Sequence, residues 1–179
     1  MKKIGIAIIL NLFTTICTYN YPIIPNLDPK GPLMNVTKVI IPAAGHGTRF
    51  LPITKSIPKE MLPLLNKPAL QEVIKESAQS GIKEACLIVS DNKKAIKDYF
   101  TPNMSYRSML KRSGKEHYMK SLVQLLDVIK MSYVTQEKML GLGHAILLGK
   151  EAVKNEMFGV ILPDMILKGE EPCLKPLVK

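Results

Sequence analysis

Residues 43–52 have the sequence AAGHGTRFLP, which continues over residues 53–63 as ITKSIPKEMLP. It follows a short apolar run from Val39 to Ile41, the pattern of a buried parallel strand. Gly45 and Gly47 end that run, and three prolines interrupt the loop beyond them. A buried strand that opens into a glycine-rich loop is typical of the carboxyl end of a strand in an α/β sheet.

Outward from this stretch, strand and helix patterns alternate along the chain. Short apolar runs predict further strands at residues 85–89, 131–135 and 160–162. Helical spacing predicts helices from Pro68 to Gly81 and over residues 93–100, 118–129 and 144–154. This order predicts an α/β fold, with a mostly parallel sheet and helices on both faces. Ligands of such sheets bind at the carboxyl ends of the strands, where residues 45–49, Gln136 and Asp164 are expected.

The loop after the first strand carries the chemistry of a phosphate site. Gly45 and Gly47 let backbone N–H groups approach an anion, and Thr48 adds a hydroxyl group. Arg49 can donate two parallel hydrogen bonds to phosphate oxygens, and Lys59 supplies a second positive charge. The loop is not a Walker A motif, and it lacks the third glycine of the dinucleotide fingerprint. The glycine pair alone is also compatible with a simple tight turn.

The whole string is more specific than its glycines. It resembles the signature of the sugar-1-phosphate nucleotidyltransferases, G-x-G-T-R-F/L-x-P-x-T-x-x-x-P-K, and the likeness runs from about Val36 to Leu167. The continuation KEMLP, followed by Lys67 and Pro68, is similar to the branch of the family that uses UTP and glucose 1-phosphate. The resemblance implies a Rossmann-like nucleotidyltransferase sheet.

The resemblance also implies roles for individual residues. Arg49 and Lys59 are expected to be catalytic, and Asp164, which ends the sequence LPD, is expected to bind Mg²⁺. Gln136 is expected to read the pyrimidine, because an amide can both donate to and accept from uracil. Glu60 is expected to contact the nucleotide or to orient Lys59. The nucleotide-binding residues implied are Ala43, Ala44, Gly45, Gly47, Thr48, Glu60, Gln136, Gly141 and Gly143.

Each of these residues also has a plain structural interpretation. Gly141 and Gly143 fit a turn that enters a helix, and Asp164 fits a helix or turn cap. Among the histidines, His46 occupies the variable position of the G-x-G turn and is expected to face solvent, and His144 is expected to cap or pack at a helix start. The functional interpretation is favoured because these residues occur together at the spacing of the family pattern.

The reaction implied by the resemblance is transfer of UMP from UTP to glucose 1-phosphate, giving UDP-glucose and pyrophosphate with Mg²⁺ as the cofactor. UTP and glucose 1-phosphate are the expected partners, and a homo-oligomer is left open. Family members are longer, with a sugar pocket beyond the strand that ends at Asp164, so the sequence predicts a truncated domain. The alternatives are a nucleotide-binding remnant without catalytic activity and an enzyme for another sugar 1-phosphate.

Composition agrees with one domain and argues against a nucleic-acid partner. The chain has 179 residues, 46% of them hydrophobic, and no tryptophan that could stack on bases. Its formal charge is +10, but eight cations fall between Lys93 and Lys120, where they favour a pair of solvated helices over a polyanion-binding face. The cysteines form no C-x-x-C pair, and Cys86 is expected in the core.

The first 33 residues differ from the rest of the chain. Lys2 and Lys3 precede an apolar run from Ile4 to Cys17, which is typical of a signal peptide and short for a membrane span. A proline-rich stretch follows, and Met34 would serve as a start. We expect residues 1–33 to lie outside the domain and residues 34–179 to form a partial nucleotidyltransferase domain in the cytoplasm. An exported or membrane-anchored protein is the alternative that the apolar run leaves open.

Overall fold

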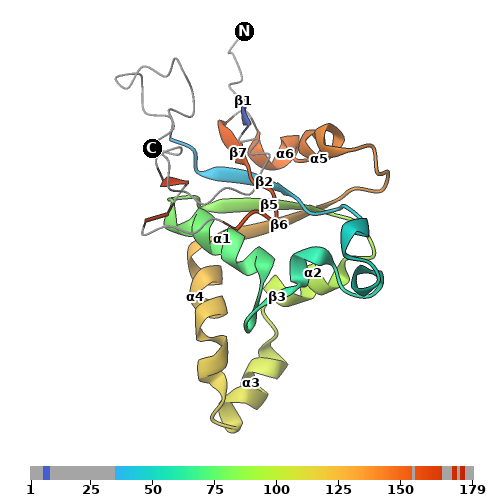
Figure 1. Cartoon of the computed structure of the whole chain (residues 1–179). Helices are drawn as coiled ribbons and strands as arrows, with labels where there is room; N and C mark the ends of the chain where they lie inside the picture. Colours follow the sequence, from blue (N-terminus) through green and yellow to red (C-terminus); the bar gives the residue numbers. More distant parts are fainter. Residues whose placement is uncertain (1–5, 9–34, 155, 167–170, 173, 176–179) are drawn as a thin grey trace.

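The structure is a computed structural model, and it describes residues 6–8, 35–154, 156–166, 171–172 and 174–175. Five strands form one sheet in the order β1-β7-β2-β5-β6, and every neighbouring pair is parallel. The α/β fold predicted from the alternation of strands and helices is therefore confirmed (Figure 1). The strands are β1 (Ile6–Ile8), β2 (Lys38–Pro42), β5 (Glu84–Val89), β6 (Lys130–Thr135) and β7 (Phe158–Val160).

Strand β2 lies inside the sheet, and its position explains its apolar sequence. Val39, Ile40 and Ile41 are at most 1% exposed. Val39 and Ile41 belong to the core cluster on one face of the sheet, whereas Ile40 belongs to the cluster on the other face. Because successive side chains of a strand point to opposite faces, a strand that is covered on both sides is apolar at every position.

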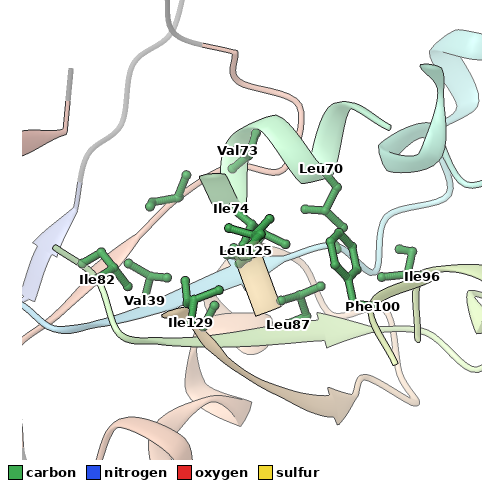
Figure 2. Close-up of a cluster of buried hydrophobic side chains, with 14 of the residues drawn as sticks. Val39, Leu70, Val73, Ile74, Ile82, Leu87, Ile96, Phe100, Leu125 and Ile129 are labelled. Carbon is green, nitrogen blue, oxygen red and sulfur yellow. The ribbon is translucent and has the colours of Figure 1, made fainter. Parts of the chain in front are cut away.

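One face of the sheet is covered by the larger core. Leu70, Val73 and Ile74 form the apolar stripe of one helix and pack with Leu87 of β5 and Leu125 (Figure 2). This stripe has the helical spacing that the sequence predicts, and the proline before it and the glycine after it bound the helix as expected. The helices on this face are α1 (Ala69–Gln79), α2 (Lys94–Phe100) and α4 (Lys120–Val128).

The opposite face is covered by α5 (Leu142–Leu148) and α6 (Lys150–Val153), which lie across the sheet from α1 in Figure 1. They pack on Ile40 and on Cys86, which is buried as predicted. The prediction of a single helix over residues 144–154 is wrong, because the chain divides at Gly149. A Cβ atom at Gly149 would lie 2.5 Å from Cδ1 of Ile40, so the missing side chain is what allows the two helices to approach β2.

Other boundaries also differ from the sequence expectation. The last strand is β7, which ends at Val160, although the backbone N–H of Ile161 still donates to the carbonyl of Ile40 at 3.1 Å. The helix expected from residue 118 begins at Lys120, after the 3₁₀ turn η4 (Glu116–Met119). A two-stranded hairpin, β3 (Pro63–Leu64) with β4 (Lys67–Pro68), precedes α1.

The bounds of helix α3 (Met104–Arg112) are not indicated by an apolar pattern, although solvated helices are expected in this region. Leu110 is its only buried residue, so no apolar stripe marks it. In Figure 1, α3 and the adjoining end of α4 project away from the sheet. The cations of this projection are exposed, as expected for solvated helices, at Arg107, Lys111, Arg112, Lys115 and Lys120.

Lys93 is an exception to that pattern. It is only 5% exposed, so the expectation of a solvated residue is wrong for it. It lies beyond the end of β5 rather than on the outer surface of a helix, and it faces a carboxylate described below. Within the part of the chain that the structure describes, no helix is long and apolar enough to cross a membrane.

Candidate active site

The candidate site lies where the parallel strands end, which we call the carboxyl edge: the residues that directly follow β2, β5, β6 and β7. Three backbone hydrogen bonds continue the sheet past the strand ends and align this edge. The N–H of Ala43 donates to Ile88 at 2.7 Å, that of Gln136 donates to Val89 at 2.7 Å, and that of Ile161 donates to Ile40 at 3.1 Å. The loops that carry the predicted residues therefore begin side by side.

The loop after β2 folds into three consecutive 3₁₀ turns, which its prolines separate. They are η1 (Thr48–Phe50), η2 (Ile53–Lys55) and η3 (Lys59–Met61). Gly47 has a φ of 67°, a left-handed conformation that strongly favours glycine, and its carbonyl accepts a hydrogen bond from Oγ1 of Thr54 at 2.8 Å. A side chain at Gly47 would also press on Thr54 and Lys59, with its Cβ 3.2–3.3 Å from their carbons. Gly47 thus brings the two ends of the loop together.

The start of this loop is divided between the core and the surface. Ala43 and Ala44 are buried at the end of β2, while Gly45, Thr48 and Arg49 are exposed. His46 is exposed as well, as its place in the G-x-G turn predicts. The loop therefore presents its glycine backbone, one hydroxyl group and one guanidinium group to solvent from a fixed base.

Lys59 and Asp164 meet across the carboxyl edge. Nζ of Lys59, in η3, donates to Oδ2 of Asp164 at 2.7 Å. Asp164 lies four residues beyond β7, so this ion pair joins two loops that are 105 residues apart in sequence. The Asp164 side chain is 45% exposed and that of Lys59 is 22% exposed, so both groups are open to a ligand. Two residues proposed from separate motifs are thus neighbours.

Behind this pair lies a buried ion pair that the sequence does not indicate. Nζ of Lys93 donates to both carboxylate oxygens of Glu60, at 2.9 and 2.8 Å. Glu60 is 0% exposed, and burial lowers the pKa of Lys93 below the usual lysine value, with the Glu60 carboxylate opposing that shift. The pair fastens η3 to the start of α2, directly beside Lys59. The sequence could have indicated this role of Lys93 only through its location, because Lys93 follows a buried strand whose carboxyl end lies at this edge.

Gln136 forms a second polar cluster at the end of β6. Its Nε2 atom lies 3.3 Å from the carbonyl oxygen of Gly141 and 2.9 Å from Nδ1 of His144, in the first turns of α5. Gln136 is buried, and Gly141 has a φ of 91°, which favours glycine. His144 is more than a packing residue at a helix start, since it is a polar partner of the residue expected to read the base.

Other predicted residues have no such partner. Arg49 makes no ion pair with any residue that the structure describes, and Gly143 is exposed in the first turn of α5. Within the same described residues, no group of three or more His, Cys, Asp or Glu side chains is placed to hold a metal ion. A hollow on α3, lined by Ser105, Ser108, Met109, Arg112 and Ser113, includes none of the predicted residues.

Comparisons with known proteins agree with this geometry. The nucleotidyl transferase family matches residues 38–177. The UTP–glucose-1-phosphate uridylyltransferase YngB of Bacillus subtilis (strain 168) is 43% identical over 143 residues, which are 80% of this chain and 48% of that protein. The UTP–glucose-1-phosphate uridylyltransferase of Staphylococcus haemolyticus is 39% identical over 146 residues, 82% of this chain and 51% of that protein.

Solved structures give the same assignment. Apo UDP-glucose pyrophosphorylase is 40% identical, with a TM-score of 0.73, and the match covers 79% of this chain and 53% of that one. The UTP-bound enzyme from Acinetobacter baumannii is 36% identical, with a TM-score of 0.71, over 75% of this chain and 47% of that one.

The chain spans about half the length of the curated relatives that it matches. Within that span, the family match begins at β2 and includes the whole carboxyl edge. The fold, the signature loop and the relatives agree, and the chain belongs to the nucleotidyl transferase family.

Proposed function

We propose that this chain is the nucleotide-binding part of an enzyme that transfers UMP from UTP to glucose 1-phosphate and releases pyrophosphate. The observation that carries the proposal is the carboxyl edge, where the glycine-rich loop after β2, the Lys59–Asp164 pair and Gln136 after β6 lie along one edge of the sheet. The names of the relatives support the choice of UTP and glucose 1-phosphate. The substrates are cytoplasmic metabolites, so we place the protein in the cytoplasm.

The proposed mechanism depends on position and charge. An oxygen of the sugar phosphate attacks the α-phosphorus of UTP in line, and pyrophosphate leaves on the opposite side. The attacking oxygen is already anionic, so the step needs no general base, and catalysis consists of holding the reactants and neutralising charge. Arg49, which is exposed and without an ion-pair partner among the described residues, would bind the β- and γ-phosphates. Lys59 would neutralise charge near the α-phosphate.

Asp164 fits a magnesium site of the kind that is completed by the substrate. Mg²⁺ is commonly held by one or two carboxylates together with phosphate oxygens and water, and Asp164 offers one exposed carboxylate beside the phosphate loop. Bound there, Mg²⁺ would neutralise the charge of the phosphates. Nζ of Lys59 donates to Oδ2 of Asp164, so the carboxylate that would hold Mg²⁺ and the amine that would neutralise charge near the α-phosphate are adjacent.

The first test is nucleotide binding by the full chain, measured by calorimetry with Mg²⁺. We expect UTP to bind more tightly than ATP, and equal or tighter binding of ATP would refute the uridine assignment. Arg49→Ala should weaken UTP binding by about 1.5–3 kcal/mol, because it removes a charge-assisted contact. Arg112→Ala, an exposed arginine on α3, is the matched control and should leave the affinity unchanged.

Turnover is tested separately from binding, because the alternative is a chain that binds nucleotide without catalysing transfer. Pyrophosphate release is measured with UTP, glucose 1-phosphate and Mg²⁺. Release that depends on the sugar phosphate supports the enzyme, whereas tight UTP binding without release supports the binding-only alternative. Replacing glucose 1-phosphate with another sugar 1-phosphate tests the sugar specificity.

A further inference from the structure

Thr54 makes two contacts with Gly47, the second glycine of the loop that follows β2. Its Oγ1 atom donates to the carbonyl oxygen of Gly47 at 2.8 Å. Its methyl carbon lies 3.2 Å from the position that a Cβ atom at Gly47 would take, so the methyl group covers the side of the glycine where a side chain would stand. Residues 48–57 are exposed except for Thr54, which is half-buried. The Thr54 side chain is therefore directed into the loop, whereas its neighbours in sequence face solvent.

These contacts restrain a residue that has little conformational preference of its own. Gly47 has a φ of 67° and a ψ of 30°, and glycine populates positive and negative φ values about equally. The carbonyl oxygen of Gly47 accepts from the backbone N–H of Phe50 at 2.9 Å and from the Thr54 hydroxyl group, so both of its lone pairs are used. Phe50 belongs to the same turn as Gly47, and Thr54 is the donor that comes from outside that turn.

Thr54 is itself held in place by the turn η2. The backbone N–H of Lys55 donates to the carbonyl of Pro52 at 3.1 Å. The backbone N–H of Ser56 donates to the carbonyl of Ile53, also at 3.1 Å. The Thr54 hydroxyl group therefore projects from a closed turn, which gives it a fixed base from which to hold the glycine.

The hydrogen bond to Gly47 also orients the next N–H group of the chain. In a planar trans peptide unit the C=O and N–H groups point in opposite directions, so fixing the carbonyl of Gly47 fixes the N–H of Thr48. Within the part of the chain that the structure describes, this N–H donates to no protein acceptor, and Thr48 is exposed. The peptide unit thus turns its acceptor toward Thr54 and leaves its donor free for a ligand.

We propose that Thr54 is a positioning residue, whose hydroxyl group holds the Gly47–Thr48 peptide unit so that the Thr48 N–H donates to a phosphate group of the nucleotide. The inference rests on the proposed function and adds the group that sets the loop in its binding conformation. Thr54 acts through Gly47 and touches no substrate. Without the hydroxyl group, Gly47 can adopt the other conformations open to glycine, so binding must also order the loop, and this cost weakens the affinity.

The test compares matched variants of the full chain. Thr54→Val removes the hydroxyl group and keeps the shape of the side chain, whereas Thr54→Ser keeps the hydroxyl group and removes the methyl group. Thr101→Val is the control, because the hydroxyl group of Thr101 also donates to a backbone carbonyl, that of Lys97 at 2.7 Å, at the end of α2. Calorimetry with Mg²⁺ measures binding of UTP and of inorganic tripolyphosphate, and urea denaturation measures the stability of each variant.

We expect Thr54→Val to bind UTP and tripolyphosphate about tenfold less tightly than the wild type, the scale of one hydrogen bond. Thr54→Ser should lose at most about twofold, and Thr101→Val should bind as the wild type does. A purely structural role predicts a folded, less stable Thr54→Val that binds both ligands normally, and that result would overturn the proposal. Equal losses in Thr54→Val and Thr54→Ser would overturn it as well, because the hydroxyl group would then not be the cause.

A measurement on the wild-type chain does not depend on whether Thr54→Val folds. In isotope-labelled protein, the backbone amide resonance of Thr48 should shift when tripolyphosphate and Mg²⁺ are added. The amide of Gly114, another glycine with a φ of 67°, should not shift. An unchanged Thr48 resonance in protein that binds tripolyphosphate would overturn the inference and leave the proposed function standing. Absence of binding of both UTP and tripolyphosphate by the wild type would refute the proposed function, and the inference with it.

Discussion

Two lysines at opposite ends of the sheet form ion pairs of similar length with different surroundings. At the amino end, Lys38 opens β2 and donates to Glu156 at 2.8 Å. At the carboxyl edge, Lys93 donates to both oxygens of Glu60 at 2.9 and 2.8 Å. The Glu156 side chain is 53% exposed, whereas Glu60 is 0% exposed. The Glu156 carboxylate of the first pair is therefore open to water, whereas the Lys93–Glu60 pair is enclosed by protein.

The surroundings give the two amines opposite shifts. The hydrogen bond that Lys38 donates to the Glu156 carboxylate raises the pKa of Lys38, because it favours the charged amine. Burial lowers the pKa of Lys93, because the charged amine has lost its hydration. The N···O distance alone therefore does not rank the two ion pairs. The pair that costs more to bury is the one that fastens η3, and with it Lys59, to the start of α2.

Removing each amine in turn tests how much the surroundings of the two pairs matter. Lys93→Met leaves Glu60 as a buried, unpaired carboxylate, so we expect the free energy of unfolding to fall by about 3–5 kcal/mol. Lys38→Met leaves Glu156 half in water, and we expect a loss of at most about 1 kcal/mol. Urea denaturation of both variants measures the difference. Equal losses would show that the enclosure of Glu60 carries no energetic weight.

A smaller effect is expected on nucleotide binding. Glu60 and Lys59 are adjacent in η3. In Lys93→Met the unpaired Glu60 carboxylate should move toward solvent, and this movement should displace η3 and the Lys59 amine. We expect UTP to bind about tenfold less tightly to Lys93→Met, about 1.4 kcal/mol, and unchanged to Lys38→Met. Calorimetry below the unfolding temperature of each variant measures this. If a folded Lys93→Met variant binds UTP as tightly as the wild type, the Lys93–Glu60 pair contributes to stability and not to nucleotide binding.

The smallest expected effect is in the pH dependence of stability. Lys93 has a lowered pKa when folded, so the unfolded chain binds more protons as pH approaches about 10.4, and stability should rise with pH in that window. Lys38 has a raised pKa, so its contribution should persist below about 10.4 and disappear above it. Urea titrations from pH 8 to 11, with each Met variant subtracted from the wild type, isolate the two slopes. Slopes of the same sign would contradict the prediction.

The sheet was predictable because its signals are local. Val39 to Ile41 and Ala85 to Val89 are apolar at every position, and such runs have few alternatives to a strand covered on both faces. The position of Asp164 followed from the same argument, since residues after parallel strands share an edge. By contrast, α3 exposes nearly all of its residues, so no periodic pattern records it.

The polar partners at the site were not predictable from the same patterns. Composition places Lys93 among surface cations, and only the fold shows that it lies against Glu60, 33 residues away. His144 offers a similar lesson, because its contact with Gln136 depends on how the turn at Gly141 returns the chain to the sheet. A residue type indicates what a side chain can do, but its partner is decided by three-dimensional packing.

Gly149 has a consequence for how freely the sequence can change. Ile40 occupies the space that a Cβ atom at residue 149 would need, 2.5 Å from its Cδ1. An alanine there would lift the end of α5 from β2, and the displaced helix is the one that carries His144. A core substitution at Ile40 would therefore change the room available at Gly149, and with it the seating of the helix that carries His144.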